Sequence, residues 1–132
     1  MNELKVEKLA QVDLDDAGDI AVFSFVRKAK VLRAGLLITT ADTTAAAIEI
    51  DKRILAGSDT GRTAAIDTVT KPASNQQGKY IYASINTDVD AGDQLVFQVS
   101  VDPATAVTAI PVIEYVEEPE SQANLTDTVE TA

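Results

Sequence analysis

The sequence predicts an all-β domain in which two antiparallel sheets pack as a β-sandwich. Short segments alternate apolar and polar residues, and clusters of Gly, Asp, Asn, Thr and Pro separate them. An amphipathic helix of useful length is hard to find in the sequence. The spacing of the segments is typical of a sandwich, and a jelly-roll-like wrap is the natural architecture. With 132 residues, the chain can bury the core of one domain.

We expect three regions along the chain. Residues 1–18 form an extended N-terminal arm or first strand, and residues 19–116 form the sandwich. Residues 117–132 form an acidic tail that contains one Leu, one Val and no aromatic residue, so it cannot contribute much to a core. The tail is therefore expected to be flexible, or ordered only against a partner.

The predicted strands number about eight, in keeping with a sandwich. The first lies within Leu4 to Leu14. The others, each recognised by alternation or by a short apolar run, are Asp19 to Val26, Lys30 to Thr40, Ala46 to Leu55, Thr63 to Thr70, Lys79 to Asn86, Gln94 to Val101 and Val107 to Val116.

Three strands carry a further expectation about their surroundings. The segment from Asp19 to Val26 is apolar on both sides, which indicates a central strand. The segment from Ala46 to Leu55 alternates isoleucines with Glu49 and Asp51, which indicates one wet face. Pro111 cannot donate a hydrogen bond to a neighbouring strand, so its strand is expected at an edge or at a bulge.

Composition excludes several kinds of chemistry. The chain has no cysteine and no histidine, so it lacks disulfides, the usual general base and the usual zinc ligands. A formal net charge of −10 argues against nucleic acid as a partner. The charged N-terminal segment is unlike a secretory signal, and the longest apolar run, Ala34 to Ile38, falls short of the roughly 20 residues of a membrane span. We expect a soluble protein made in the cytosol, with no membrane partner.

An acidic cluster, Asp88, Asp90 and Asp93, precedes the strand "QLVFQVSV". Counted from Asp88, a calcium-binding loop of the helix-flanked kind needs an oxygen ligand where Gly92 stands and Glu where Val99 stands, so the match fails. Aspartate and glycine are also the residues that tight turns require. The cluster is therefore interpreted as a turn, with an incidental divalent-ion site as the alternative.

Glu49 and Asp51 project from the same face of one predicted strand, and Asp67 or Glu114 could face them. Paired carboxylates can hydrolyse glycosides when their separation and environments suit that task. Alternating acidic residues are more often the wet face of a strand, and no nucleophile motif is present. We therefore predict that the protein is not an enzyme and has no cofactor.

Basic residues gather at one strand junction, at Arg27, Lys28, Lys30 and Arg33, whereas from Gln94 onward the chain has seven acidic residues and no basic one. The basic junction could dock an acidic partner, or it could be a solvated turn that protects a sheet edge. Tyr80 and Tyr82 share one face of a strand. They could stack on sugars or pack in a subunit interface.

The acidic cysteine-free chain, its short strands rich in Ala, Thr and Val, the strand entry "AGDQLVFQVSV" and the extended segments at both ends resemble the jelly-roll decoration, or cement, proteins of tailed bacteriophage capsids. The resemblance implies a homodimer or homotrimer that binds the major capsid protein on the outer surface of the expanded capsid, after assembly in the host cytoplasm.

The side chains that we expect to be exposed then indicate which residues contact another subunit or the capsid. We expect Tyr80, Tyr82 and Val96 between subunits, with the N-terminal arm and Arg27 to Arg33 facing the capsid. The alternative function is a carbohydrate- or receptor-binding β-sandwich module of a phage fibre. That function needs a platform of exposed aromatic residues, for which three Tyr, three Phe and no Trp are a thin supply.

Overall fold

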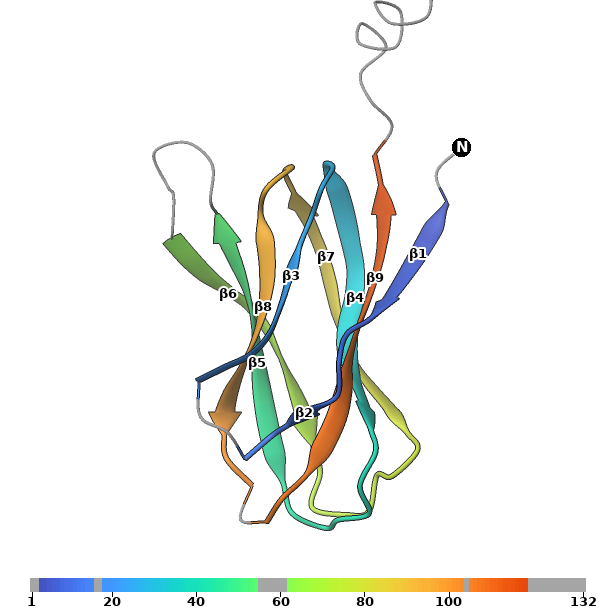
Figure 1. The fold of residues 1–132 in the computed structure, drawn as a ribbon, viewed down its shortest axis with the longest axis vertical. Helices are drawn as coiled ribbons and strands as arrows, with labels where there is room; N and C mark the ends of the chain where they lie inside the picture. The colour runs from blue at the N-terminus through green and yellow to red at the C-terminus, as the bar shows by residue number, and fades with distance from the viewer. Residues whose placement is uncertain (1–2, 16–17, 55–61, 104, 119–132) are drawn as a thin grey trace, which may run out of the picture.

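A computed structural model describes residues 3–15, 18–54, 62–103 and 105–118 (Figure 1). Every regular element in these ranges is a β-strand. In chain order the strands are β1 (Leu4–Lys8), β2 (Val12–Asp13), β3 (Gly18–Ser24), β4 (Ala29–Ile38), β5 (Ala46–Ile54), β6 (Arg62–Lys71), β7 (Tyr80–Val89), β8 (Gln94–Val101) and β9 (Thr108–Glu117). The predicted tail from residue 119 onward lies outside the described residues. The described part of the chain has no helix that could span a membrane.

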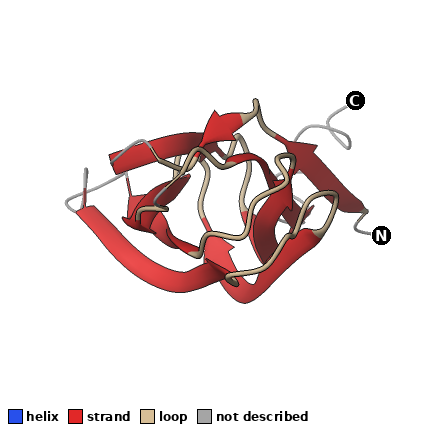
Figure 2. Ribbon diagram, turned by 90° about the horizontal axis from the view of Figure 1, so that it is seen from below, coloured by secondary structure: helices blue, strands red, loops and turns tan. Residues whose placement is uncertain are grey.

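The strands form two antiparallel sheets that pack face to face. Sheet A has the order β1-β9-β4-β7, with β2 also paired to β9, and sheet B has the order β3-β8-β5-β6. Figure 2 shows the two layers nearly end-on, with loops crossing between them. The predicted all-β, two-sheet antiparallel sandwich is confirmed.

The core lies between the sheets because alternate residues of each strand point inward. Leu36 and Ile38 of sheet A, with Ile50 and Phe97 of sheet B, are fully buried there. An aromatic group extends the core, in which Phe25 packs edge-on against Phe23 and Tyr115, with ring centres 4.9 Å and 5.3 Å apart. Continuous burial of this kind supplies the main favourable free energy of folding.

The expectation for Pro111 is wrong in one respect, because β9 is a central strand, paired with both β1 and β4. The missing N–H is tolerated for a local reason. The N–H and C=O of a strand residue point to the same side, and Pro111 O accepts a hydrogen bond from Leu9 N at 2.9 Å. Pro111 thus faces the break between β1 and β2, where no strand residue needs its N–H.

The expectation for the segment from Asp19 to Val26 is also wrong, because β3 is an edge strand of sheet B. One apolar row, which includes Phe23 and Phe25, packs toward the core. The other row stays in solvent, with Val22 at 42% and Val26 at 83% exposure. Two apolar faces are therefore compatible with an edge strand when one of the faces is left uncovered.

Candidate functional site

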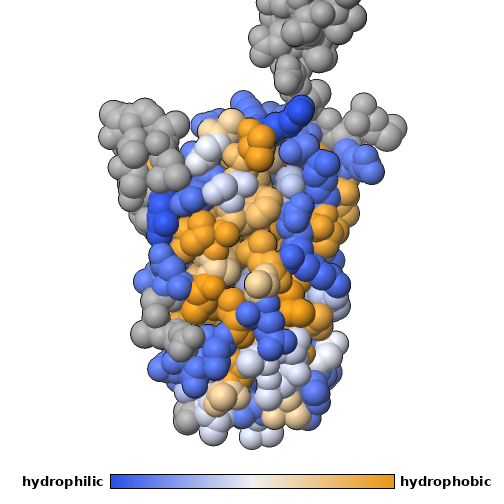
Figure 3. Space-filling model, viewed as in Figure 1, coloured by the Kyte–Doolittle hydropathy of each residue, from blue (hydrophilic) through white to orange (hydrophobic). Residues whose placement is uncertain are grey.

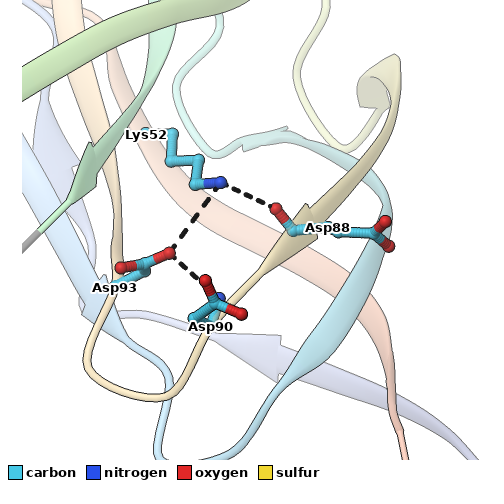
Figure 4. Close-up of polar contacts among 4 residues, drawn as sticks. All are labelled: Lys52, Asp88, Asp90 and Asp93. Carbon is cyan, nitrogen blue, oxygen red and sulfur yellow. Dashed lines mark hydrogen bonds and ion pairs between the residues drawn. The ribbon is translucent and has the colours of Figure 1, made fainter. Parts of the chain in front are cut away.

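The acidic cluster forms the turn between β7 and β8 (Figure 4). Asp93 Oδ2 accepts a hydrogen bond from Asp90 N at 2.9 Å, and Asp93 N donates to Asp90 O at 3.0 Å. Gly92 adopts a φ of +92°, which a residue with a Cβ rarely adopts. The chain around Asp93 thus needs its aspartate and glycine for backbone geometry, as the turn interpretation requires.

Lys52 of β5, the neighbour of β8 in sheet B, reaches this turn between the two sheets. Its Nζ donates to Asp88 O at 2.9 Å and lies 3.8 Å from Asp93 Oδ2, as Figure 4 shows. Asp93 is only 1% exposed, so the ammonium supplies the counter-charge that a buried carboxylate needs. Among the described residues, no group of three or more carboxylates is arranged to hold a metal ion. The cluster closes one end of the core.

Lys71 of β6 has a comparable role near the loops that follow β4 and β6. Its side chain is 1% exposed, and its Nζ lies within hydrogen-bonding distance of the backbone oxygens of Asp42, Thr44, Pro72 and Ser74, at 3.1, 2.7, 3.3 and 3.3 Å. The ammonium thereby ties the loop after β4 to the loop after β6. No sequence pattern indicates this role, because Lys71 is indistinguishable in the sequence from other charged residues at the end of a strand.

The carboxyl pair Glu49 and Asp51 lies on the outer face of sheet B. The wet face predicted for β5 is wrong at Asp51, which is only 2% exposed. When the amide nitrogen of Gln98 faces the pair, it donates to Asp51 Oδ2 at 3.0 Å and to Glu49 Oε2 at 3.3 Å. The pKa of Asp51 is raised to about 6, mainly by burial of the carboxyl group and secondly by its hydrogen bond to Glu49.

The other two carboxylates considered with this pair do not join it. Asp67 is exposed on β6, where its Oδ1 accepts a hydrogen bond from Thr68 N, and Glu114 lies on β9 in the other sheet. Asp19, whose charge also raises the pKa of Asp51, is held by Arg53 at 2.7 Å. Within sheet B the geometry therefore brings together the carboxyl groups of Glu49 and Asp51 and the Gln98 amide.

The outer face of sheet A carries an ordered stack of aromatic and cationic side chains. The rings of Tyr80 and Tyr82 are parallel within 3°, with centres 5.8 Å apart. The Arg33 guanidinium lies 3.8 Å from the centre of the Tyr82 ring, and Lys8 Nζ lies 5.6 Å from that of Tyr80. Arg33 Nε also donates to Glu114 Oε1 at 2.8 Å. Four strands thus contribute side chains to one cluster.

Gly35 on β4 lets β7, which carries Tyr80 and Tyr82, approach closely. It pairs with Tyr82, and a Cβ added at Gly35 would lie 2.0 Å from Ile81 O. Only glycine fits such an approach between two backbones. The two tyrosine rings stack on each other, Tyr82 also contacts the Arg33 guanidinium, and Tyr80 remains 44% exposed.

Two exposed apolar residues of β1 lie beside the stack on the same face, since Val6 pairs with Glu114. Leu4, Val6 and Tyr80 are 51%, 52% and 44% exposed. We define the sheet A face by the residues of the stack and the two exposed residues of β1: Leu4, Val6, Lys8, Arg33, Tyr80, Tyr82 and Glu114. Val96, which we expected to share an interface with the tyrosines, lies in sheet B and is completely buried, so this conformation leaves it no surface for a partner.

Two of the four residues of the basic junction pair with acidic residues near the end of β9. Arg33 pairs with Glu114, and Lys28 Nζ lies 3.8 Å from Glu118 Oε2. Lys30 is exposed on β4, and Arg27 is exposed in the loop before that strand. The two charge blocks are distant in the sequence, but β4 pairs with β9 and brings them together. Part of the junction's charge is therefore neutralised within the chain.

Comparison of the chain with protein-family models, with curated proteins and with solved structures finds no match. The two packed sheets alone assign the chain to the β-sandwich proteins. The sheet A face is its candidate interaction surface.

Proposed function

We propose that this protein is a structural virion protein, a capsid decoration or cement protein that binds the outer surface of an expanded phage capsid and stabilises it. The observation that carries the proposal is the sheet A face, where apolar, tyrosine and arginine side chains lie together in solvent. Protein interfaces are enriched in aromatic residues and arginine. Large exposed apolar residues that lie close together commonly mark a docking surface.

The strand order supports the jelly-roll wrap that the proposal includes. When β1 and β2 are counted as one interrupted strand, the nine strands become eight, and their order is 1-8-3-6 in sheet A and 2-7-4-5 in sheet B. Strands that are neighbours in the chain therefore alternate between the sheets for most of its length, as in two interleaved Greek keys. Such a body presents two broad outer faces, and one of them can lie flat on a shell.

The sheet A face fits a partner that is itself partly apolar and acidic. Burying one valine or leucine that was fully exposed contributes about 1.5–3 kcal/mol, so half-exposed Leu4 and Val6 add a modest amount per copy. Binding of many copies to the expanded lattice alone would then stabilise that lattice by linkage. Weak contacts suffice because the shell offers many identical sites.

The test is co-sedimentation of the purified protein with expanded and unexpanded capsid shells of its phage, stripped of their own decoration, at two salt concentrations. We expect saturable binding to expanded shells, and a Tyr80→Ala variant should bind at least tenfold more weakly. The matched control is Val101→Ala, because Val101 is 51% exposed on sheet B. Absence of binding to both shells would refute the proposal, and equal loss in both variants would refute the assignment to sheet A.

A further inference from the structure

The two sheet edges on one side of the sandwich are protected to different degrees. β1, the edge of sheet A, has the sequence LKVEK and carries charges at Lys5, Glu7 and Lys8. Such charges discourage pairing with another strand. β3, the edge of sheet B, is followed directly by Phe25 and Val26, and no charged residue occurs from Ile20 to Val26. The edge at β3 is therefore open to pairing.

An apolar groove runs beside this edge. It has a volume of about 280 Å³ and is lined by Leu9, Ala10, Val12, Ile20, Ala21 and Val22. Figure 3 shows hydrophobic side chains running down this side of the molecule, with hydrophilic side chains on both flanks. An edge strand with no charged residue after Asp19, next to an apolar groove, leaves both backbone groups and apolar area available to an added strand.

The backbone groups that face outward can be identified. Phe25 N donates to Asp93 O at 2.9 Å, and Phe25 O accepts from Gly92 N at 2.8 Å, so Phe25 faces the β8 side. Alternate residues of a strand present their N–H and C=O groups to opposite sides. Val22 and Ser24 therefore present theirs to the free edge.

The sequence of this edge is complementary to itself. In the segment DIAVFSFVR, from Asp19 to Arg27, uncharged and mostly apolar residues flank Phe23 on both sides, with Asp19 at one end and Arg27 at the other. Antiparallel pairing of two copies centred on Phe23 places Val22 opposite Ser24. It also brings the bulge of β3 between Asp19 and Ala21 in one copy near Val26 and Arg27, which form the bend after β3, in the other copy. Asp19 already accepts a hydrogen bond from Arg53 in its own chain, so Arg27 of the second copy would extend an existing ion pair.

From these observations we propose that the chain forms a two-fold homodimer in which β3 of one copy pairs antiparallel with β3 of a second copy. In this register Val22 and Ser24, which face the free edge, exchange both of their backbone hydrogen bonds across the interface. Sheet B then continues from one copy into the other. Val26, 83% exposed in the single chain, reaches Ile20 in the groove of the second copy.

The charges of the molecule favour a second copy of this chain as the occupant. A chain with a net charge of −10 repels itself over most of its surface. Pairing at β3 joins two stretches that are uncharged from Ile20 to Val26 and places Asp19 of each copy near Arg27 of the other. The complementarity thus offsets the repulsion at the contact. The dimer does not depend on the proposed function, because the protein alone suffices to test it.

The first test measures molar mass by light scattering and sedimentation equilibrium over a range of concentrations. We expect the 14.0 kDa chain to form a dimer. A Val22→Lys variant should raise the dimer dissociation constant at least tenfold, because the lysine places a charge at the edge. Val101→Lys is the matched control, an exposed valine on the same sheet away from that edge, and it should dimerise as the wild type does.

The second test checks the register by cross-linking. The chain has no cysteine, so single cysteines can be introduced at Val22 and at Ser24. On mild oxidation, a mixture of Val22→Cys and Ser24→Cys proteins should form more cross-linked dimer than either protein alone, because residue 22 faces residue 24. A Ser100→Cys protein on β8 serves as the background.

The outcomes separate the possibilities. A monomer at all concentrations, a trimer, or equal weakening by Val22→Lys and Val101→Lys would overturn the proposal. Cross-linking that is no greater in the mixture than in the separate proteins would overturn the register. Circular dichroism of each variant shows whether the fold is retained, and the cross-linking variants test the interface even if the lysine variant unfolds.

Discussion

Arg33 and Tyr82 are held together across two strands, with the guanidinium 3.8 Å from the ring centre, while Arg33 Nε donates to Glu114. The three groups affect one another's proton affinity. The pKa of Tyr82 lies above its ordinary value because the ring is partly buried and because its hydroxyl interacts with Glu114, while the charge of Arg33 acts in the opposite direction. Removing either neighbour should therefore shift the tyrosine in a defined direction.

Replacement of Glu114 with Gln should lower the pKa of Tyr82, because the carboxylate that disfavours the phenolate is lost. Replacement of Arg33 with Met should raise it, because a stabilising cation is lost. Phenolate absorbance followed through a pH titration measures both shifts, and a Tyr82→Phe protein identifies the transition that belongs to Tyr82. Shifts of the same sign in both variants would contradict the geometry of the stack.

Asp51 should make the protein less stable at neutral pH than at acidic pH. The folded state raises its pKa from 3.8 to about 6, chiefly through burial and the hydrogen bond to Glu49. A raised pKa means that the folded state binds the proton more tightly, so this contribution is complete below pH 3.8 and is lost as the pH rises through about 6. The loss at pH 7 is about 1–3 kcal/mol.

An Asp51→Asn variant should remove this dependence. The amide cannot ionise and can still hydrogen bond to Glu49 and Gln98, so urea denaturation at pH 7 should show a higher free energy of unfolding than in the wild type. Between pH 4 and 6 the curve of the variant should be flatter. The groups facing Asp51, which are Glu49, Asp19 and Arg53, are unchanged in the variant. A variant that is less stable at pH 7 would show that the ionised carboxylate is the favoured form.

Most of the strands could be predicted from the sequence, because alternation is a local property. The predicted segment from Gln94 to Val101 coincides with β8, and the segment ending at Asn86 fails only because β7 continues past a bulge. Asn86 has a φ of +47°, and this turn-like conformation occurs within the paired strand. The predicted strand ended at Asn86, whereas β7 only bends there and continues to Val89.

Strand order and the candidate site were harder to predict, because both depend on pairing between distant segments. Alternation correctly placed Tyr80 and Tyr82 on one face, but it could not show that β4 would bring Arg33 beside Tyr82. Val96 and Asp51 both alternate like surface residues, yet they pair with each other across β8 and β5 and are buried there. The contacts that the ammonium groups of Lys52 and Lys71 make with buried backbone and carboxylate oxygens likewise could not be predicted, because they depend on how the two sheets pack.

Gly35→Ala should destabilise the protein strongly. The added methyl group would lie 2.0 Å from Ile81 O. Gly35 is on β4, in the middle of sheet A, and Ile81 is on its edge strand β7, so the two backbones must separate. A loss of about 2–4 kcal/mol or more is expected, as for other forced backbone shifts. Thermal unfolding measures the effect. Gly78→Ala is the informative comparison, because no atom lies near the added methyl group and only the positive φ of +79° opposes it.

Removing the ammonium of Lys71 should destabilise the loops that it joins. In Lys71→Met the apolar stem keeps most of its packing, but the four backbone oxygens around Nζ, which lie at part-buried positions, lose their donor. Hydrogen bonds to charged groups each contribute about 1.5–3 kcal/mol, and their effects overlap here, so a total loss of about 2–4 kcal/mol is expected. Lys79→Met, at an exposed lysine in the same region, should change stability by less than about 0.5 kcal/mol.

The Lys71 variant also has a local signature. Because Nζ ties the carbonyl of Thr44 to that of Ser74, amide hydrogen exchange should accelerate in the loops after β4 and β6 more than in β8. Uniform acceleration throughout the chain would indicate that Lys71 acts only through global stability. Unchanged exchange in both loops, together with unchanged denaturation, would contradict a structural role for the buried ammonium.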